Sequence, residues 1–279
     1  MYPGHPAREE GNNMTEKING NIPDNKTIEL LMAHSSCRKF LDRPVPDEVA
    51  DTIIRCAQHA PTSSYLQAYT IIKVKDKEKR KALAEFAGGQ EWVEKAGLVL
   101  LFCADLHRLD VMLNISDKNV LHNAELYTVA VTDAALASSR ALIAGQAMGL
   151  GGVFVGGVRN ETEKMAELFN LPELVFPMYA VCMGYPEEVP PQKPRMDMNM
   201  ISAEDSYPEI TGPKQLADYE KEVSEYFLAI TGGRSGRGWI ERAEHAISLK
   251  PRYSVGEFLS KAGFMTASGP MEEKKNKTR

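Results

Sequence analysis

The sequence predicts a layered domain of the α/β or α+β class. Its 279 residues suffice for one large domain or two small ones, with a sizeable core. Helical and strand-like patterns are mixed along the chain, and only about four segments have the pattern of a good strand. Hydrophobic residues make up 43% and charged residues 25% of the sequence, which is typical of an ordinary globular protein.

The clearest element of the N-terminal half is a helix at residues 46–60. Pro46 and Asp47 suit its first turn, an apolar stripe begins at Val49, and Pro61 ends it. Four other segments are expected in this half: a short helix at 27–34, a strand rich in β-branched residues at 69–74, a surface helix at 75–89 and an uninterrupted apolar strand at 98–105. We expect this last strand at the centre of the sheet.

The longest helix is expected over residues 119–149. At about 1.5 Å per residue it would span roughly 45 Å. Within residues 124–148 only Glu125, Asp133 and Arg140 carry charge, so the helix is apolar nearly all round. A helix of this kind is buried on every side, either in a core or against a second subunit.

The C-terminal half continues the mixture of helices and strands. We expect a strand at 153–158, a helix at 161–170, a strand at 178–185, a helix at 214–230 and a final helix at 254–262. After Pro186 the chain is rich in Pro and Met, which indicates an extended excursion to about Pro213. The glycine-rich sequence TGGRSGRGW (231–239) is expected to be a mobile loop.

Charge and hydropathy argue against two classes of partner. The net charge of −5 argues against a nucleic-acid-binding protein, since a phosphate backbone is bound by a basic surface. Residues 141–158 are nearly free of polar side chains and long enough to suggest a membrane span. Six glycines interrupt this stretch, however, and GLGG is typical of a helix end followed by a short strand, so we expect no membrane segment.

The cysteines and the chain ends suggest where the protein resides. Cys37, Cys56, Cys103 and Cys182 are far apart in sequence, and most have apolar neighbours, so we expect reduced thiols and a cytoplasmic location. The N-terminus lacks the apolar stretch of a secretory signal. Residues 1–24 are expected to be a disordered leader, and 266–279 a charged disordered tail.

Several chemistries lack their motifs. The sequence contains no G-x-x-x-x-G-K-[ST] phosphate loop, no G-x-S-x-G nucleophile elbow and no H-E-x-x-H metal helix. The six histidines show no ligand spacing, so we expect no metal site. GLGG at 149–152 precedes a strand, whereas the dinucleotide-binding fingerprint follows one. Hydrolase, kinase-like and Rossmann dehydrogenase functions are therefore disfavoured.

One polar cluster alternates along the chain directly after the first helix. His34, Ser36 and Arg38 occupy every second position of HSSCR. In an extended segment they would line one side at intervals of roughly 6.6 Å. A ring N–H, a hydroxyl and a forked guanidinium could together hold a phosphate. The alternative is a solvated polar helix terminus.

Four further clusters have weaker individual signals. PTSSYLQ (61–67) follows a helix and could be a simple Ser/Thr turn, and GGQEW (88–92) could be a helix C-cap, although Gln90 could also bind the edge of a heterocycle. The glycines of VFVGG (153–157) would let a flat ligand approach the backbone. Lys193 and Arg195 flank Pro194, so an extended chain would aim both cations the same way.

Together, these clusters give the chain a family resemblance. From about residue 26 to 262 it resembles the oxygen-insensitive NADPH nitroreductases and NADPH–flavin oxidoreductases of bacteria. The resemblance rests on the order and spacing of five motifs: H-x-S-x-R-x-F, S-S-[FY]-L-Q, G-G-Q, G-L-G-G-V-[FY]-[IV]-G-G-[LV]-R-N and K-P-R. It implies an α+β, three-layer nitroreductase-like fold with a central mixed β-sheet surrounded by helices. It also implies a single FMN-binding domain at 25–265, with the excursion and mobile loop at 186–240.

The resemblance also implies an intertwined homodimer with FMN at the subunit interface. The residues that it assigns to FMN are His34, Ser36, Lys193 and Arg195 at the phosphate, Arg38 at the ribityl chain or pyrimidine edge, Thr62 and Ser63 from across the interface, Gln90 at the isoalloxazine, and Val155, Gly156 and Gly157 near N5. No side chain is assigned as an acid or base. Arg38 is the candidate for stabilising negative charge at flavin N1.

The chain departs from the family pattern at two places. Pro61 and Thr62 stand where the family usually has serines, although Thr62 keeps a hydroxyl. The first of the arginines that favour NADPH in the family aligns with Ile230. Arg234 and Arg237 are the replacements that we expect to bind NADPH, and the choice between NADPH and NADH stays open.

The implied activity is a ping-pong hydride relay from NADPH through FMN to a nitroaromatic, a quinone or a free flavin. One alternative is another specificity on the same scaffold: flavin, azo or chromate reductase. A second is a flavoprotein that binds FMN without turnover. A third, a structural dimer that has lost its cofactor, is opposed by the retained Arg38, Lys193 and Arg195.

Overall fold

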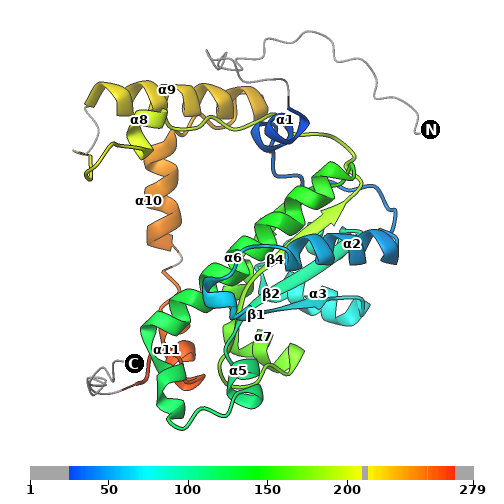
Figure 1. Ribbon diagram of the computed structural model, residues 1–279. Helices are drawn as coiled ribbons and strands as arrows, with labels where there is room; N and C mark the ends of the chain where they lie inside the picture. The colour runs from blue at the N-terminus through cyan, green and yellow to red at the C-terminus, as the bar shows by residue number, and fades with distance from the viewer. Residues whose placement is uncertain (1–24, 209–212, 250, 268–279) are drawn as a thin grey trace.

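The computed structural model of the protein describes residues 25–208, 213–249 and 251–267 (Figure 1). The strands are β1 (Tyr69–Lys73), β2 (Leu98–Asp105), β3 (Gly151–Val155) and β4 (Val175–Gly184). The α-helices are α1 (Lys26–Met32), α2 (Asp47–Gln58), α3 (Lys77–Phe86), α4 (Glu91–Lys95), α5 (His107–Met112), α6 (Ala124–Ala147), α7 (Thr162–Phe169), α8 (Met198–Ile201), α9 (Pro213–Ile230), α10 (Trp239–Leu249) and α11 (Ser254–Lys261). Three 3₁₀ turns are η1 (Ser63–Tyr65), η2 (Lys118–His122) and η3 (Gly156–Arg159). The leader expected at 1–24, and the tail expected at 266–279 apart from residues 266 and 267, lie outside the described residues.

The four strands form one sheet in the order β1-β2-β4-β3. The strand expected at the centre is β2, which is buried along its whole length between β1 and β4. Each neighbouring strand pair is antiparallel. Within the described residues, the mixed character that we expected comes only from an isolated parallel bridge between Ser36 and Gly152. The α+β class is confirmed.

Helices cover both faces of this sheet and make three layers (Figure 1). Because side chains alternate along a strand, β2 contributes to two separate cores. Its even-numbered residues from Leu98 to Ala104 pack with α2 and α6, and its odd-numbered residues from Val99 to Cys103 pack with α3, α4 and α7. The alternation therefore builds the three-layer arrangement from one apolar strand.

Helix α6 covers one face of the sheet and leaves its own outer side open. It begins at Ala124, later than expected, because the Asn123 side chain caps it by accepting a hydrogen bond of 2.8 Å from Leu126 N. Its outer side carries no charge over three turns and is exposed at Thr128, Thr132, Ala135, Leu136 and Ser139. Among the helices in the described part of the chain, none combines the length and the apolar composition that a membrane span needs.

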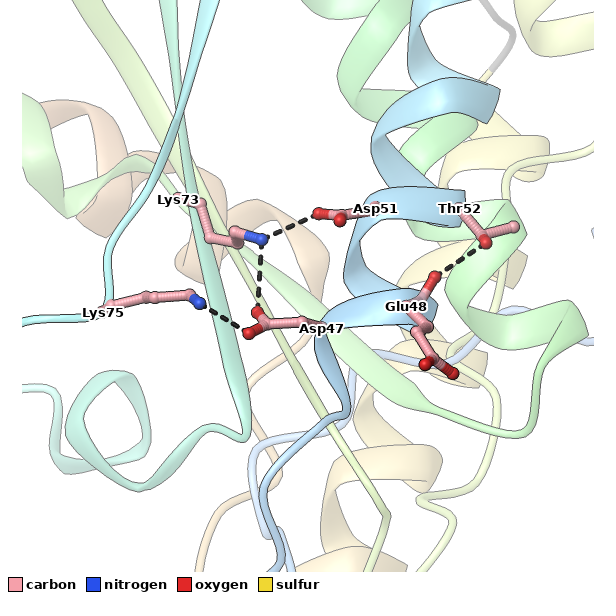
Figure 2. Close-up of polar contacts among 6 residues, drawn as sticks. All are labelled: Asp47, Glu48, Asp51, Thr52, Lys73 and Lys75. Atoms are coloured by element: carbon pink, nitrogen blue, oxygen red, sulfur yellow. Dashed lines mark hydrogen bonds and ion pairs between the residues drawn. The ribbon is translucent and has the colours of Figure 1, made fainter.

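Lysines on β1 and just beyond it hold the start of α2 (Figure 2). Lys73 Nζ lies 2.8 Å from Asp51 Oδ1 and 3.3 Å from Asp47 Oδ1, and Lys75 Nζ lies 2.7 Å from Asp47 Oδ2. The two lysines lower the pKa of Asp47. Carboxylates in a first turn also face the positive end of the helix dipole, so this cluster fixes the end of α2 farthest from the serine-rich segment.

Helices α9 and α10 project away from the sheet (Figure 1). Helix α10 was missed in the sequence because its N-terminus is capped from far away: Ile240 N donates to Glu220 Oε2 of α9 at 2.8 Å. The loop between them is tied to α9, since Ser224 Oγ donates to Gly236 O at 2.6 Å and Ser235 N donates to Thr231 Oγ1 at 3.0 Å.

Candidate functional site

The alternating segment at 34–38 runs beside β3. Cys37 N donates to Gly152 O at 3.0 Å, and His34 Nδ1 lies 3.1 Å from Gln146 Nε2 of α6. The Cys37 side chain is buried, whereas Ser36 is half-buried and Arg38 is exposed. Because side chains alternate along an extended segment, burying Cys37 places Ser36 and Arg38 on the opposite side. The alternation in the sequence predicts this arrangement.

The segment around Lys193 and Arg195 is held next to the same region. Gln192 Nε2 donates to Met32 O at the end of α1 at 2.6 Å, and Tyr226 Oη of α9 donates to Pro191 O at 3.0 Å. These contacts bring two motifs that are about 155 residues apart in the sequence to one place. The first and last of the five motifs therefore meet.

Four cations gather there. Lys193 is exposed but partly desolvated, which lowers its pKa, and the neighbouring charges of Arg38, Arg195 and Arg242 lower it further. Within the described residues no aspartate or glutamate forms an ion pair with any of the four. The guanidiniums of Arg38 and Arg195 instead donate to backbone carbonyls, at 3.5 Å from Ser36 O and 3.0 Å from Lys193 O. Like charges that lack a counter-ion make this cluster a natural anion site.

The glycine pair and Gln90 lie next to this cation cluster and to each other. A Cβ placed on Gly157 would lie 2.7 Å from Gln90 Nε2, which itself donates to Ala87 O at 2.7 Å. Arg38 Cζ lies 5.7 Å from the centre of the Trp92 ring, two residues after Gln90. Val155 and Gly157 are buried in this chain, backbone included, whereas Gly156 is half-buried, so Gly156 is the residue of the three that is partly open to a ligand.

These residues fit FMN on the chemistry of their donors. A forked guanidinium and an ammonium suit a phosphate dianion, and the cluster supplies both, with no ion-paired carboxylate in the part of the chain that the structure describes. An amide side chain beside glycine backbone suits the edge and face of a flat heterocycle. Four of the five motifs thus converge: those of Arg38, Gln90, Gly157 and Lys193.

The sequence pattern of the nitroreductase family matches residues 31–185, more than half of the chain. This chain belongs to the nitroreductase family. The pattern of the family's C-terminal domain matches residues 193–267, which include α9 and α10.

Relatives of this nitroreductase-family chain match nearly their whole length. It is 36% identical to an FMN reductase (NADPH) of Bacillus subtilis, over 86% of this chain and 98% of the relative. It is also 36% identical to an oxygen-insensitive NADPH nitroreductase of Salmonella typhimurium, with the same coverage. The solved structure of the NfrA1 nitroreductase from B. subtilis superposes with a TM-score of 0.82, at 35% identity, over 86% of this chain and 99% of that one. The family and the fold that the motifs predicted are confirmed.

The remaining motif, the serine-rich segment of Thr62 and Ser63, stands apart from the others in the nitroreductase-family chain. Thr62 is half-buried and Ser63 is exposed, on a loop that packs against α6. In the described residues no hydrogen bond or ion pair joins either one to the other four motifs. Their contact with FMN across a subunit interface therefore stays a prediction.

The two arginines expected to bind NADPH are engaged elsewhere. Arg237 Nε lies 3.0 Å from Glu241 Oε1, and Arg234 Nε donates to Thr231 O at 2.9 Å. The arginine of this region that faces the cation cluster is Arg242, which stacks 3.2 Å above the Phe227 ring. Arg242 was not predicted from the sequence, because the contact that caps α10 and the approach of Arg242 to Lys193 both depend on tertiary structure.

A second pair of arginines lines a shallow cavity of about 550 Å³ that is wide open to solvent. Arg159 donates to Met178 O, and a Cβ on Gly156 would lie 3.1 Å from Arg159 Nη2. Burial lowers the pKa of Arg159, and Arg252 lowers it further. The remaining lining residues are Pro251, Tyr253, Val255, Gly256 and Leu259. Arg159 belongs to the G-G-[LV]-R-N motif, so the sequence did contain a signal for this cavity.

Proposed function

We propose that this chain is an FMN-dependent oxidoreductase that uses NADPH, or NADH, to reduce nitroaromatics, quinones or related acceptors by two electrons. The observation that carries the proposal is the cluster of Arg38, Lys193, Arg195 and Arg242, which forms no ion pair with a carboxylate of the described residues and lies next to Gln90 and Gly157. The names of the relatives, FMN reductase (NADPH) and oxygen-insensitive NADPH nitroreductase, support the same cofactor and donor.

The protein's own part in this reaction is binding, orientation and charge. FMN, when bound, supplies the hydride chemistry, taking two electrons from the nicotinamide and passing them to the acceptor. Lys193 and Arg195, with His34 and Ser36, would hold its phosphate, while Gln90 and the backbone of residues 155–157 would fix the plane of the ring. Arg38 would place positive charge near the pyrimidine edge, where negative charge develops on reduction.

A homodimer is part of the proposal. The outer side of α6 exposes Leu136 with small uncharged residues on three turns and Arg140 one turn further on, and the arm formed by α8–α10 exposes Met198, Ile201, Ile247 and Leu249. Apolar side chains gathered on projecting elements are typical of a surface that a second copy covers. A partner subunit would also supply the loop of Thr62 and Ser63 that one chain leaves away from the other motifs.

The cavity beside the glycine pair favours a second candidate function, that of a flavin reductase. Arg159 and Arg252 place two guanidiniums at a cavity adjacent to Gly156. In the described residues neither arginine forms an ion pair with a carboxylate; Arg252 Nε instead donates to Asn160 Oδ1 at 2.9 Å. An acceptor with an anionic group, such as free FMN, would satisfy them.

A reducing cytoplasm remains the proposed compartment. All four cysteines are free thiols, and Cys37, Cys103 and Cys182 are buried. Burial raises the pKa of all three thiols, that of Cys182 to about 12. The three buried thiols are therefore protonated and serve as small apolar side chains.

One optical experiment tests cofactor, donor and acceptor together. The visible spectrum of the purified protein should show a flavin that is bleached by NADPH without oxygen and restored by nitrofurazone or a quinone. Restoration by FMN should be faster than by riboflavin, which lacks the phosphate, if the arginine cavity receives an anionic acceptor. A colourless protein that cannot be reconstituted with FMN would refute the proposed function, and a reducible flavin that no acceptor restores would support the non-catalytic alternative.

A further inference from the structure

Asp133 is a buried carboxylate for which the proposed chemistry has no use. Its side chain is completely buried (0% exposed) in the middle of α6, among alanines and other small residues. In the described part of the chain, no lysine, arginine or histidine forms an ion pair with it. A carboxylate buried without a counter-ion is costly to fold, so its hydrogen bonds should show what it does.

Both oxygens of Asp133 accept hydrogen bonds from the backbone of one loop. Oδ1 accepts from Ser63 N at 2.9 Å, and Oδ2 accepts from Ala68 N at 3.0 Å. These two amides stand at the two ends of loop 63–68, between α2 and β1. A carboxylate can accept at two oxygens at once, which an amide side chain cannot do. The loop is therefore held at both ends by one side chain.

The loop needs such an anchor because its backbone is strained. Ser64, Tyr65 and Gln67 have φ values of 47°, 58° and 53°, in the left-handed region that residues other than glycine avoid. Conformations of this kind persist only where the surroundings fix them. Side-chain packing contributes little, since Tyr65 is 83% exposed and the other two side chains are also exposed.

We propose that Asp133 is a positioning residue for FMN binding: it holds loop 63–68 so that the hydroxyls of Thr62 and Ser63 are in place before the cofactor arrives. The inference rests on the proposed function, in which these hydroxyls meet FMN across the subunit interface. A loop that is ordered beforehand does not have to lose conformational freedom when the ligand binds. Helix α6 carries both this anchor and the proposed dimer surface, so it relates the loop of one subunit to the cofactor of the other.

The test compares the full-length wild type with Asp133→Asn and Asp133→Ala, each stripped of flavin and titrated with FMN while flavin fluorescence is followed. Asparagine keeps the shape but turns an amide N–H toward one of the two N–H donors. The dissociation constant for FMN should rise roughly tenfold or more in Asp133→Asn. Light scattering and thermal melting of the FMN-free proteins report whether assembly and folding are retained.

Ser138→Ala is the matched control. Ser138 is also completely buried on α6, but its hydroxyl donates to Ala135 O at 2.8 Å and contacts the Tyr179 hydroxyl at 3.4 Å, not the loop. Its dissociation constant for FMN should stay at the wild-type value even where its melting temperature falls. A purely structural role for Asp133 would make the two variants alike in both measurements.

Hydrogen exchange reports the positioning directly. In FMN-free wild type the amides of Ser63 and Ala68 should be protected, and Asp133→Asn should lose that protection while the sheet keeps its own. An unchanged dissociation constant in Asp133→Asn overturns the inference. So do unprotected Ser63 and Ala68 amides in wild type, a measurement that does not depend on a variant folding. If the wild type binds no FMN, both the proposed function and the role of Asp133 are refuted. If the wild type binds FMN normally and one of the two results above is found, only the role of Asp133 is refuted.

Discussion

The lowered pKa of Lys193 indicates that its surroundings favour a negatively charged ligand. Partial desolvation and three nearby arginines lower its pKa from the ordinary value of 10.5. Holding the protonated amine there destabilises the FMN-free fold at pH values below the lowered pKa, and this penalty disappears as pH rises through the lowered pKa toward 10.5. An anionic phosphate would reverse the effect. In the proposed site, Lys193 would therefore favour binding of the FMN phosphate and lower the stability of the FMN-free protein.

Replacing Lys193 with Met should therefore separate stability from binding. The FMN-free Lys193→Met variant should melt at the wild-type temperature or above it, because a repelled charge is gone. Its dissociation constant for FMN should rise roughly tenfold, the effect of one charge-assisted hydrogen bond. Lys39→Met is the control, since Lys39 Nζ already pairs with Glu188 Oε1 at 2.7 Å. A fall in melting temperature with unchanged FMN affinity in Lys193→Met would contradict the assigned role.

Single residues also show what the sequence could and could not reveal. Arg38, Gln90 and Lys193 were predicted because each lies in a short motif whose spacing is visible in the chain. Arg242 was not, because its approach to Lys193 depends on how α9 and α10 fold back toward the excursion. Asp133 was noticed only as a rare charge in an apolar helix, since its partners, Ser63 N and Ala68 N, are backbone groups that no sequence pattern marks.

Among the helices and strands, apolar periodicity predicted where an element lies in the chain better than how long it is. The strand at 98–105 and the helices at 46–60 and 161–170 were found close to their observed bounds, because each has a strong pattern and flanking Pro, Gly or Asp. The strand expected at 153–158 begins and ends earlier, as β3, since Gly156 starts the 3₁₀ turn η3. The glycine pair at 156–157 could continue the strand or start a turn, and tertiary contacts decide between the two.

The loop between α9 and α10 is where donor preference should be decided. Arg234 and Arg237 lie on it, and Glu241 of the first turn of α10 neutralises Arg237 at 3.0 Å. The double variant Arg234→Ala with Arg237→Ala should raise the KM for NADPH roughly tenfold and leave the KM for NADH nearly unchanged, because only NADPH carries a 2′-phosphate. Steady-state kinetics with both donors and one acceptor measure this.

Glu241→Gln is the companion variant for this loop. It leaves both arginines in place and removes the carboxylate that competes with a phosphate for Arg237. The KM for NADPH should fall, and that for NADH should not change. An equal rise for both donors in the double variant would show that the loop does not distinguish them, and would direct attention to Arg242, which faces the cation cluster.

At the scale of the whole molecule, one chain presents the residues of the proposed site on two separated surfaces. The motifs of Arg38, Gln90, Gly157 and Lys193 converge near the end of β3, whereas the loop of Thr62 and Ser63 is anchored to α6. The exposed side of α6 and the apolar residues of the arm are the surfaces that a second copy would cover. Assembly and cofactor binding should therefore depend on each other.

A charge on the outer side of α6 tests this dependence. Leu136 is 39% exposed in the middle of that side, so Leu136→Glu should convert the proposed dimer to a monomer and raise the dissociation constant for FMN roughly tenfold or more, through loss of the partner's loop. Light scattering and FMN titration measure the two effects. Lys81→Glu places an acidic side chain on an exposed position of α3, on the other face of the sheet, and should change neither. A monomer of Leu136→Glu that binds FMN as the wild type does would show that one chain holds the complete socket, and an intact dimer would place the interface elsewhere.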